Sequence, residues 1–190
     1  NETLEKAQQN KADFLVELIE PKPGEKILDL GCGWGGMLKR VYEETKDKKN
    51  LIGYTLSKEQ KKYIEKKYNF RVKLKDFINA DYKESSFDKI YSVESFEHVR
   101  TKELLPLAIK LKKALKPKGR IVHQFVCQIN ELPHPMVLAG GFDIFSGSEY
   151  TYLKKHLEVF DKAGLKIVNF SVGDYRPTLK AWFQRLIENK

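Results

Sequence analysis

The chain has 190 residues and a hydrophobic content of 41%, which is enough apolar material for one folded domain with a real core. Its two cysteines, Cys32 and Cys127, lie far apart and form no CxxC pair, which argues against a disulfide framework and a metal site. No run approaches the roughly 18 to 20 apolar residues of a membrane-spanning helix, and no signal-peptide pattern opens the sequence. We therefore predict a single domain over 1–190 that is soluble and cytoplasmic.

The net charge of +9 comes mainly from two basic stretches. Residues 58–75 hold eight basic and two acidic residues, and residues 102–120 hold seven and one. Such stretches can attract an anionic membrane, nucleic acid or an acidic small molecule. Because they lack the aromatic pattern of a base-stacking platform, nucleic acid is not expected as a partner. The basic stretches could simply be solvated faces of helices. The functional alternative is that they make peripheral contact with an anionic membrane.

Apolar spacing predicts an opening helix over 1–20, which ends before two prolines. Strand and helix patterns then alternate along the chain. The predicted strands cover 26–30, 50–54, 71–74, 87–93, 120–126 and 165–172. The predicted helices cover 37–44, 57–67, 102–115, 153–163 and 178–188, and a turn is expected at 116–119. Strands separated by helices favour an α/β fold, with a doubly wound, mostly parallel sheet and helices on both faces.

Residues 128–152 interrupt this alternation with several prolines and glycines. A segment of this length between two regular elements favours a short lid inserted before the last helices. Its aromatic side chains could line the site of an apolar acceptor, shield a cation or simply pack the loop; they are Phe142, Phe145, Tyr150 and Tyr152.

A glycine-rich turn, Leu28-Asp-Leu-Gly-Cys-Gly-Trp-Gly-Gly36, follows the first predicted strand and precedes a helix. Glycines there let the backbone pass close to a ligand, and the helix N-terminus presents free N–H groups beside it. Such a turn could also hold a dinucleotide. The carboxylate of Asp29 would repel a pyrophosphate but can accept a hydrogen bond from a cationic amino group. The turn therefore favours a sulfonium amino-acid cofactor.

A second polar cluster, Val93-Glu-Ser-Phe-Glu-His98, follows the fourth predicted strand. Ligands of doubly wound sheets bind beyond the carboxyl ends of the strands. Glu94, Glu97 and His98 could hold a proton or remove one from a nucleophile there. The structural alternative is that Glu97 caps a helix while His98 packs.

The sequence resembles the class I methyltransferases that use S-adenosylmethionine, and within them the cyclopropane fatty acid synthases and their relatives. Matching motifs occur in family order over nearly the whole chain. They are Thr3-Leu-Glu-Lys-Ala-Gln8, Leu28 to Gly36, Thr55-Leu-Ser-Lys-Glu-Gln60, Phe87-Asp-Lys-Ile90, Ser95-Phe-Glu-His-Val99, Tyr175 and Thr178-Leu-Lys-Ala-Trp182. The Thr-Leu-Ser-x-x-Gln and Phe-Glu-His elements together are specific to this branch.

This resemblance implies a cofactor site built from several segments. The backbone at Gly31, Gly33 and Gly35 would border the methionine part of S-adenosylmethionine, with Asp29 behind it. Thr55 and Gln60 would face the ribose, although Gln60 could serve only as a helix cap. Asp81 is the candidate for the adenine amino group, and Asp76 competes for that role.

The resemblance also implies an acceptor site. In the synthases, the residue matching Glu97 helps to hold a bicarbonate ion that serves as base, and Tyr175 matches a tyrosine at the same site. Glu97 and Tyr175 are therefore the expected base or anion-positioning groups, supported by Glu94 and His98. Gln124 stands where the synthases carry a histidine, and His123 beside it faces the opposite side of a strand.

The expected function is methyl or methylene transfer to a lipid or other apolar alkene-type acceptor, with S-adenosylhomocysteine as the product. Glutamate at position 94 is a feature of the plant benzylisoquinoline N-methyltransferases, which keeps a small-molecule N- or C-methyltransferase as an alternative. A noncatalytic, cofactor-binding subunit of a methyltransferase complex is the third interpretation. An oligomer is compatible with each of them.

Overall fold

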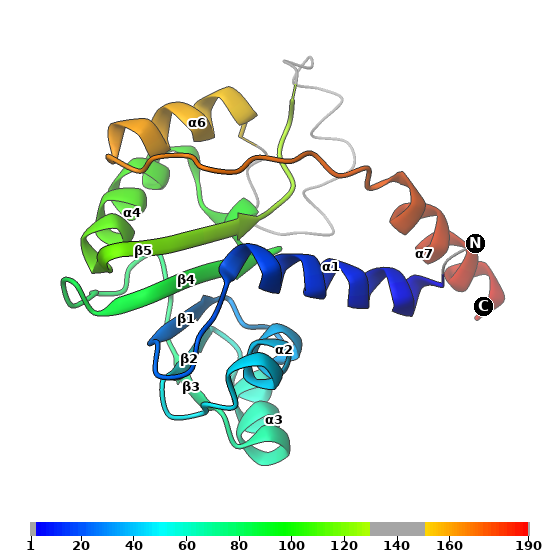
Figure 1. Cartoon of the computed structure of the whole chain (residues 1–190). Helices are drawn as coiled ribbons and strands as arrows, with labels where there is room; N and C mark the ends of the chain where they lie inside the picture. The colour runs from blue at the N-terminus through cyan, green and yellow to red at the C-terminus, as the bar shows by residue number, and fades with distance from the viewer. Residues whose placement is uncertain (1–2, 130–150, 190) are drawn as a thin grey trace.

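A computed structural model describes residues 3–129 and 151–189, and its centre is one parallel sheet (Figure 1). The strands are β1 (Ile27–Leu30), β2 (Leu51–Thr55), β3 (Arg71–Leu74), β4 (Phe87–Val93) and β5 (Leu115–Gln124). They lie in the order β3-β2-β1-β4-β5, and all four pairings are parallel. The strand order reverses direction between β1 and β4, which is where ligands of such sheets bind.

Helices cover both faces of the sheet. They are α1 (Leu4–Ile19), α2 (Gly36–Thr45), α3 (Lys58–Tyr68), α4 (Thr101–Ala114) and α6 (Leu153–Lys162), with a 3-10 helix, η1 (Phe96–His98), after β4. The helix α7 (Arg176–Glu188) lies away from the sheet, beside the amino-terminal end of α1 (Figure 1). Leu28 of β1 belongs to a core cluster with Leu104 of α4. Its neighbour Ile27 belongs to a second cluster with Ile19 of α1. Because successive side chains of a strand point to opposite faces, these two clusters confirm the doubly wound α/β fold.

Local sequence signals set the ends of the first helices. The Thr3 hydroxyl accepts a hydrogen bond from the backbone N–H of Lys6 and caps the start of α1. Glu20, which follows the last residue of α1, adopts a left-handed conformation. Ser57 caps α3 in the same way through the N–H of Gln60. Both are the N-terminal caps that hydroxyl side chains commonly form. The boundaries of α1 and α3 therefore lie close to the predicted ones.

Two predicted elements differ from the structure. The prediction of a strand at 165–172 was wrong: this segment joins no ladder, and Val168 and Val172 are 73% and 61% exposed. Its apolar pattern suits a strand, but a pattern alone provides no neighbour to pair with. The turn predicted at 116–119 lies inside β5, where the register with β4 shifts between the pairs at Phe87 and Lys89. The glycine and proline there form an irregularity within the strand rather than its start.

The two ends of the predicted insertion lie side by side. Gln128 and Tyr152 form an isolated parallel bridge, and the N–H of Leu153 donates to the carbonyl of Gln128. The proposed acceptor-lining residues Phe142, Phe145 and Tyr150 fall outside the described residues, so the lid stays a prediction. No helix among the described residues is long and apolar enough to cross a membrane.

Candidate active site

The glycine turn, which leads from β1 into α2, packs against the segment that follows β4. Gly31 has a φ of 83°, and a Cβ placed there would lie 2.6 Å from the Cβ of Ser95. The Ser95 hydroxyl is buried and donates to the carbonyl of Leu30 at 2.5 Å. Gly35 is also left-handed, and a Cβ on it would lie 3.0 Å from Ile64 of α3. At Gly33, by contrast, an added Cβ would meet nothing within 4 Å, so the outer side of the turn is open to a ligand.

Asp29 lies behind this turn, as the sequence predicts. Its side chain is buried next to Tyr91, its partner on β4, and its Oδ2 atom has no hydrogen-bond partner among the described residues. Burial raises the pKa of Asp29 to about 7, and the Tyr91 hydroxyl opposes this rise. One oxygen of the buried carboxyl therefore remains available to a donor.

The structure brings Thr55 and Gln60 together. Thr55 ends β2, and its hydroxyl donates to Oε1 of Gln60 on the first turn of α3 at 2.6 Å. The backbone N–H of Gln60 donates to Ser57, so the backbone of Gln60 takes part in the cap while its side chain contacts Thr55. This bond orients the Gln60 side chain. The cap of α3 uses only the backbone N–H of Gln60 and does not require that orientation.

The two candidates for the adenine contact differ in their surroundings. Asp76 accepts hydrogen bonds from the N–H of Ile78 and the amide of Asn79, and the N–H of the preceding residue, Lys75, donates to the carbonyl of Thr55. Phe77 follows, and its ring lies 3.8 Å from the Cβ position of Gly31. Asp81 is exposed. The segment beginning at Asp76 therefore borders the glycine turn, whereas the role of Asp81 stays a prediction.

Glu94 and Glu97 occupy different electrostatic environments. Glu94 has a φ of 51° and its carboxylate accepts from the Lys11 ammonium of α1 at 2.8 Å. The Oε2 atom of Glu97 is buried and has no partner among the described residues. Burial raises the pKa of Glu97 to about 7; Glu94 also raises it, and Lys11 lowers it. Glu97 can thus exchange a proton near neutral pH.

Contacts with two strands, β1 and β5, hold the segment that carries both carboxylates. The N–H of Glu94 donates to the carbonyl of Gln124 on β5, and Ser95 is bonded to β1. Phe96 is fully buried and stacks on the His123 ring with a centroid distance of 4.1 Å. These contacts fix the three residues before Glu97, which favours a defined position for its carboxyl group.

His98 and Tyr175 complete the predicted acceptor group. His98 closes η1 and is exposed. Tyr175 precedes α7, and its ring meets Trp182 of that helix edge-to-face at 5.9 Å. The helix itself buries no residue, although an ion pair between Arg185 and Glu5 joins it to α1. The roles of His98 and Tyr175 therefore stay predictions.

The sequence reasoning missed two features of this region. Lys11 gave no signal because its partner lies 83 residues away, so only the tertiary structure pairs them. His123 and His156 form an aromatic cluster with Phe96, Phe125 and Phe160 behind the acceptor segment. Burial lowers the pKa of His123 to about 3 and that of His156 to about 4, so both rings are neutral at pH 7. The sequence offered one signal for this cluster: His123 lies on the opposite face of its strand from Gln124, and therefore away from the acceptor site.

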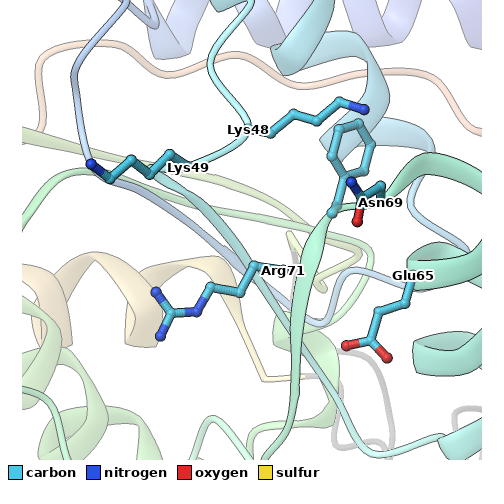
Figure 2. A pocket seen from close by; sticks show the side chains of 6 residues that line it. Lys48, Lys49, Glu65, Asn69 and Arg71 are labelled. Carbon is cyan, nitrogen blue, oxygen red and sulfur yellow. The ribbon is translucent and has the colours of Figure 1, made fainter.

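One surface hollow lies away from this site. It is lined by Lys48, Lys49, Glu65, Asn69, Phe70 and Arg71. Arg71 begins β3 and Lys49 precedes β2, so the hollow lies at the amino ends of the strands. Figure 2 shows the charged group of Lys48 pointing to the opposite side from those of Lys49 and Arg71, so the three do not converge on one ligand. Among the residues that the structure describes, no group of three potential metal ligands occurs.

A second groove runs between α1 and the first turn of α2. Gln8 and Lys11 line one side, Gly36 and Met37 the other, and Val93 of β4 reaches its end. Figure 1 shows the amino-terminal half of α1 extending past the carboxyl ends of β4 and β5. The groove therefore lies beside both the glycine turn and the acceptor segment.

This strand order, with a glycine turn after β1 and polar groups after β2 and β4, defines a Rossmann-like fold of the class I methyltransferase type. The chain belongs to the mycolic acid cyclopropane synthetase family, whose pattern matches residues 1–190. This confirms the resemblance found in the sequence.

Three similar proteins illustrate the family. A probable fatty acid methyltransferase of Mycobacterium tuberculosis is 30% identical over 198 residues, covering 98% of this chain and 45% of that protein. An (S)-coclaurine N-methyltransferase of Papaver somniferum is 35% identical over 132 residues, covering 66% of this chain and 36% of that protein. A cyclopropane synthase structure from M. tuberculosis superposes with a TM-score of 0.86 at 26% identity, covering 99% of this chain and 72% of that one. The chain thus spans less than half the length of these two sequence relatives.

Proposed function

We propose that this chain binds S-adenosylmethionine against the glycine turn and transfers a methyl or methylene group to a lipid or other apolar alkene-type acceptor. The observation that carries the proposal is the contact between Gly31 and Ser95. It joins the expected cofactor turn to the segment that holds Glu97. Cofactor and proton acceptor would thereby face the same space, as group transfer requires.

The residues present fit the cofactor. S-adenosylmethionine, when bound, supplies a methyl group already activated by a positively charged sulfur. Gly31, Gly33 and Gly35 keep the turn free of side chains, and Asp29 offers an unpaired oxygen behind it. Thr55 and Gln60 would hold the ribose through their preformed pair. The adenine contact is assigned to Asp81, with Asp76 as its competitor.

Glu97 is the proposed proton acceptor. A pKa near 7 suits a general base, because much of the group is ionised at neutral pH while its basicity stays high. An alkene acceptor must lose a proton after it accepts the carbon, and an amine must be deprotonated before it reacts. His98 and Tyr175 would support Glu97 by orienting the acceptor, and Glu94 would support it as a neighbouring charge.

The bicarbonate ion that the resemblance implies stays a prediction. Oε2 of Glu97 and Oε1 of Gln124 are both buried without a partner among the described residues. The O–H of a bicarbonate ion would donate to such an oxygen, and the Gln124 amide would supply donors to the ion. We assign no proton transfer to this ion.

An apolar acceptor is supported by two of the similar proteins, a probable fatty acid methyltransferase and a cyclopropane synthase. Lipid acceptors reside in membranes, and the basic residues of α3, such as Lys62 and Lys66, are exposed. We propose that they provide peripheral contact with an anionic membrane, an attraction that salt would screen.

The test combines calorimetry with turnover. The chain is titrated with S-adenosylmethionine and then supplied with the methyl-labelled cofactor and three acceptors: anionic vesicles of unsaturated phospholipid, a free unsaturated fatty acid, and a panel of amines. Label in the lipid, lost at high salt, is the expected result. Label only in amines would establish the small-molecule alternative. Cofactor binding without any turnover would establish the noncatalytic role, and absence of binding would overturn the proposal.

A further inference from the structure

Lys11 lies between the expected cofactor and acceptor sides of the site. It projects from α1 beside Gln8, and the groove that it lines ends at Val93. Its ammonium bonds to Glu94, the residue after Val93, at 2.8 Å. About a third of each side chain is exposed, 32% for Lys11 and 35% for Glu94, so water screens the pair only in part.

The backbone of Glu94 is constrained independently of this ion pair. Its φ of 51° is left-handed, which few residues other than glycine adopt, and its N–H is bonded to β5. A non-glycine residue held in this conformation is a feature that often accompanies a functional role. Here it turns the chain from β4 into η1, while Lys11 holds the side chain against α1.

The pair makes the two carboxylates unequal. Glu94 has a cation in contact, whereas Glu97 has a buried, unpaired oxygen. Two neighbouring carboxylates in different environments take different proton-transfer roles. Among the described residues, Glu94 and Lys11 are the two charged groups that act on the carboxyl of Glu97, and they act in opposite directions.

From this geometry we propose that Lys11 is a positioning residue of the acceptor site. By binding Glu94 it removes that carboxylate from contact with the acceptor, and it leaves Glu97 as the single group that exchanges a proton. Lys11 acts through Glu94 and touches no reacting atom. The proposal rests on the proposed function for its catalytic consequence, but its electrostatic part can be measured without turnover.

The test removes the charges of Lys11 and Glu94 singly and together, and it measures how the carboxyl groups of Glu94 and Glu97 titrate. Protein labelled with ¹³C-glutamate is titrated by NMR, and the two signals are assigned by their loss in E94Q and E97Q. Lys11→Met should raise the pKa of Glu97 by about 0.5 to 1, because an attractive charge is lost. Glu94→Gln should lower it by a similar amount, and the double variant K11M/E94Q should lie close to the wild type. Lys11→Arg should preserve the wild-type value.

Lys6→Met is the matched control, since it removes the same charge from the same helix without touching Glu94. The pH profile of kcat/KM should follow the NMR titration across this series. A K11M protein that is folded by circular dichroism and titrates like the wild type, or like K6M, would overturn the proposal. If the NMR titrations shift as expected but the rate profile does not follow, Lys11 keeps its electrostatic role and the assignment of Glu97 as base is the part that fails.

Discussion

The ribose-facing part of the cofactor side and the acceptor side differ in how their polar groups are paired. In the first, Thr55 is bonded to Gln60 and Ser57 caps α3. On the acceptor side, Glu97 and Gln124 each bury an oxygen without a partner among the described residues, as Asp29 does behind the glycine turn. Buried unpaired polar groups cost free energy, so a folded protein keeps them mainly where they serve a ligand or a reaction. The Thr55–Gln60 pair is thus preformed, while the acceptor side and Asp29 have groups still available to a ligand or a reaction.

The largest expected effect is on the acceptor side. Glu97→Gln should lower kcat about 10²- to 10⁴-fold, the usual contribution of a general base. Its affinity for S-adenosylmethionine should stay within about twofold of the wild type, because the cofactor side is untouched. Turnover and calorimetry on the same preparations check both statements. In the wild type, kcat/KM should rise with pH through about 7 as Glu97 loses its proton. Unchanged turnover in the variant would remove Glu97 from the reaction.

The next effect concerns the junction between the two sides. Gly31→Ala should lower the free energy of unfolding by about 2 to 4 kcal/mol, because a left-handed alanine is strained and its Cβ would collide with Ser95. Gly33→Ala is the matched control: its backbone is also left-handed but its Cβ would meet open space, so it should cost about 1 kcal/mol. Urea unfolding of both variants measures the difference. Equal losses would mean that the Ser95 contact does not constrain Gly31.

The aromatic cluster behind the acceptor segment should make stability depend on pH. His156 is neutral when folded, with a pKa of about 4, but takes up a proton when unfolded near pH 6.5. The contribution of neutral His156 to the free energy of unfolding is complete above about pH 6.5. It is lost as the pH falls toward 4, by about 1.4 kcal/mol per pH unit. His156→Leu should reduce this loss between pH 6.5 and 5 in urea unfolding, whereas His98→Asn, at an exposed position, should not. Identical pH dependence in both variants would contradict the burial of His156.

The smallest expected effect lies on the cofactor side. Thr55→Val removes the hydrogen bond that orients Gln60 and should weaken S-adenosylmethionine binding about three- to tenfold, the value of roughly one hydrogen bond. Ser57→Ala removes only the cap of α3, so it should lower stability by about 1 kcal/mol and leave the affinity nearly unchanged. Calorimetry separates the two outcomes. If both variants bind equally well, Gln60 serves α3 rather than the cofactor.

Much of the fold could be predicted because its signals are local. The spacing of apolar residues gave five strands of the sheet and the helices between them, and Thr3 and Ser57 marked where two helices begin. The glycine turn was visible because left-handed backbone requires glycine at Gly31 and Gly35. The prediction of a strand at 165–172 was wrong because the alternation of apolar and polar residues indicates only which side chains would share a face. It does not indicate whether another strand lies beside the segment.

The sequence by itself determined the fold class, the family and the two segments that face each other at the carboxyl edge of the sheet. Only the tertiary structure decided the state of the groups in them. The ion pair of Lys11 with Glu94, the contact of Gly31 with Ser95 and the burial of Glu97 join residues far apart in the chain. Electrostatic interactions depend on distance in space and on access to water, and neither quantity is written in the order of the residues.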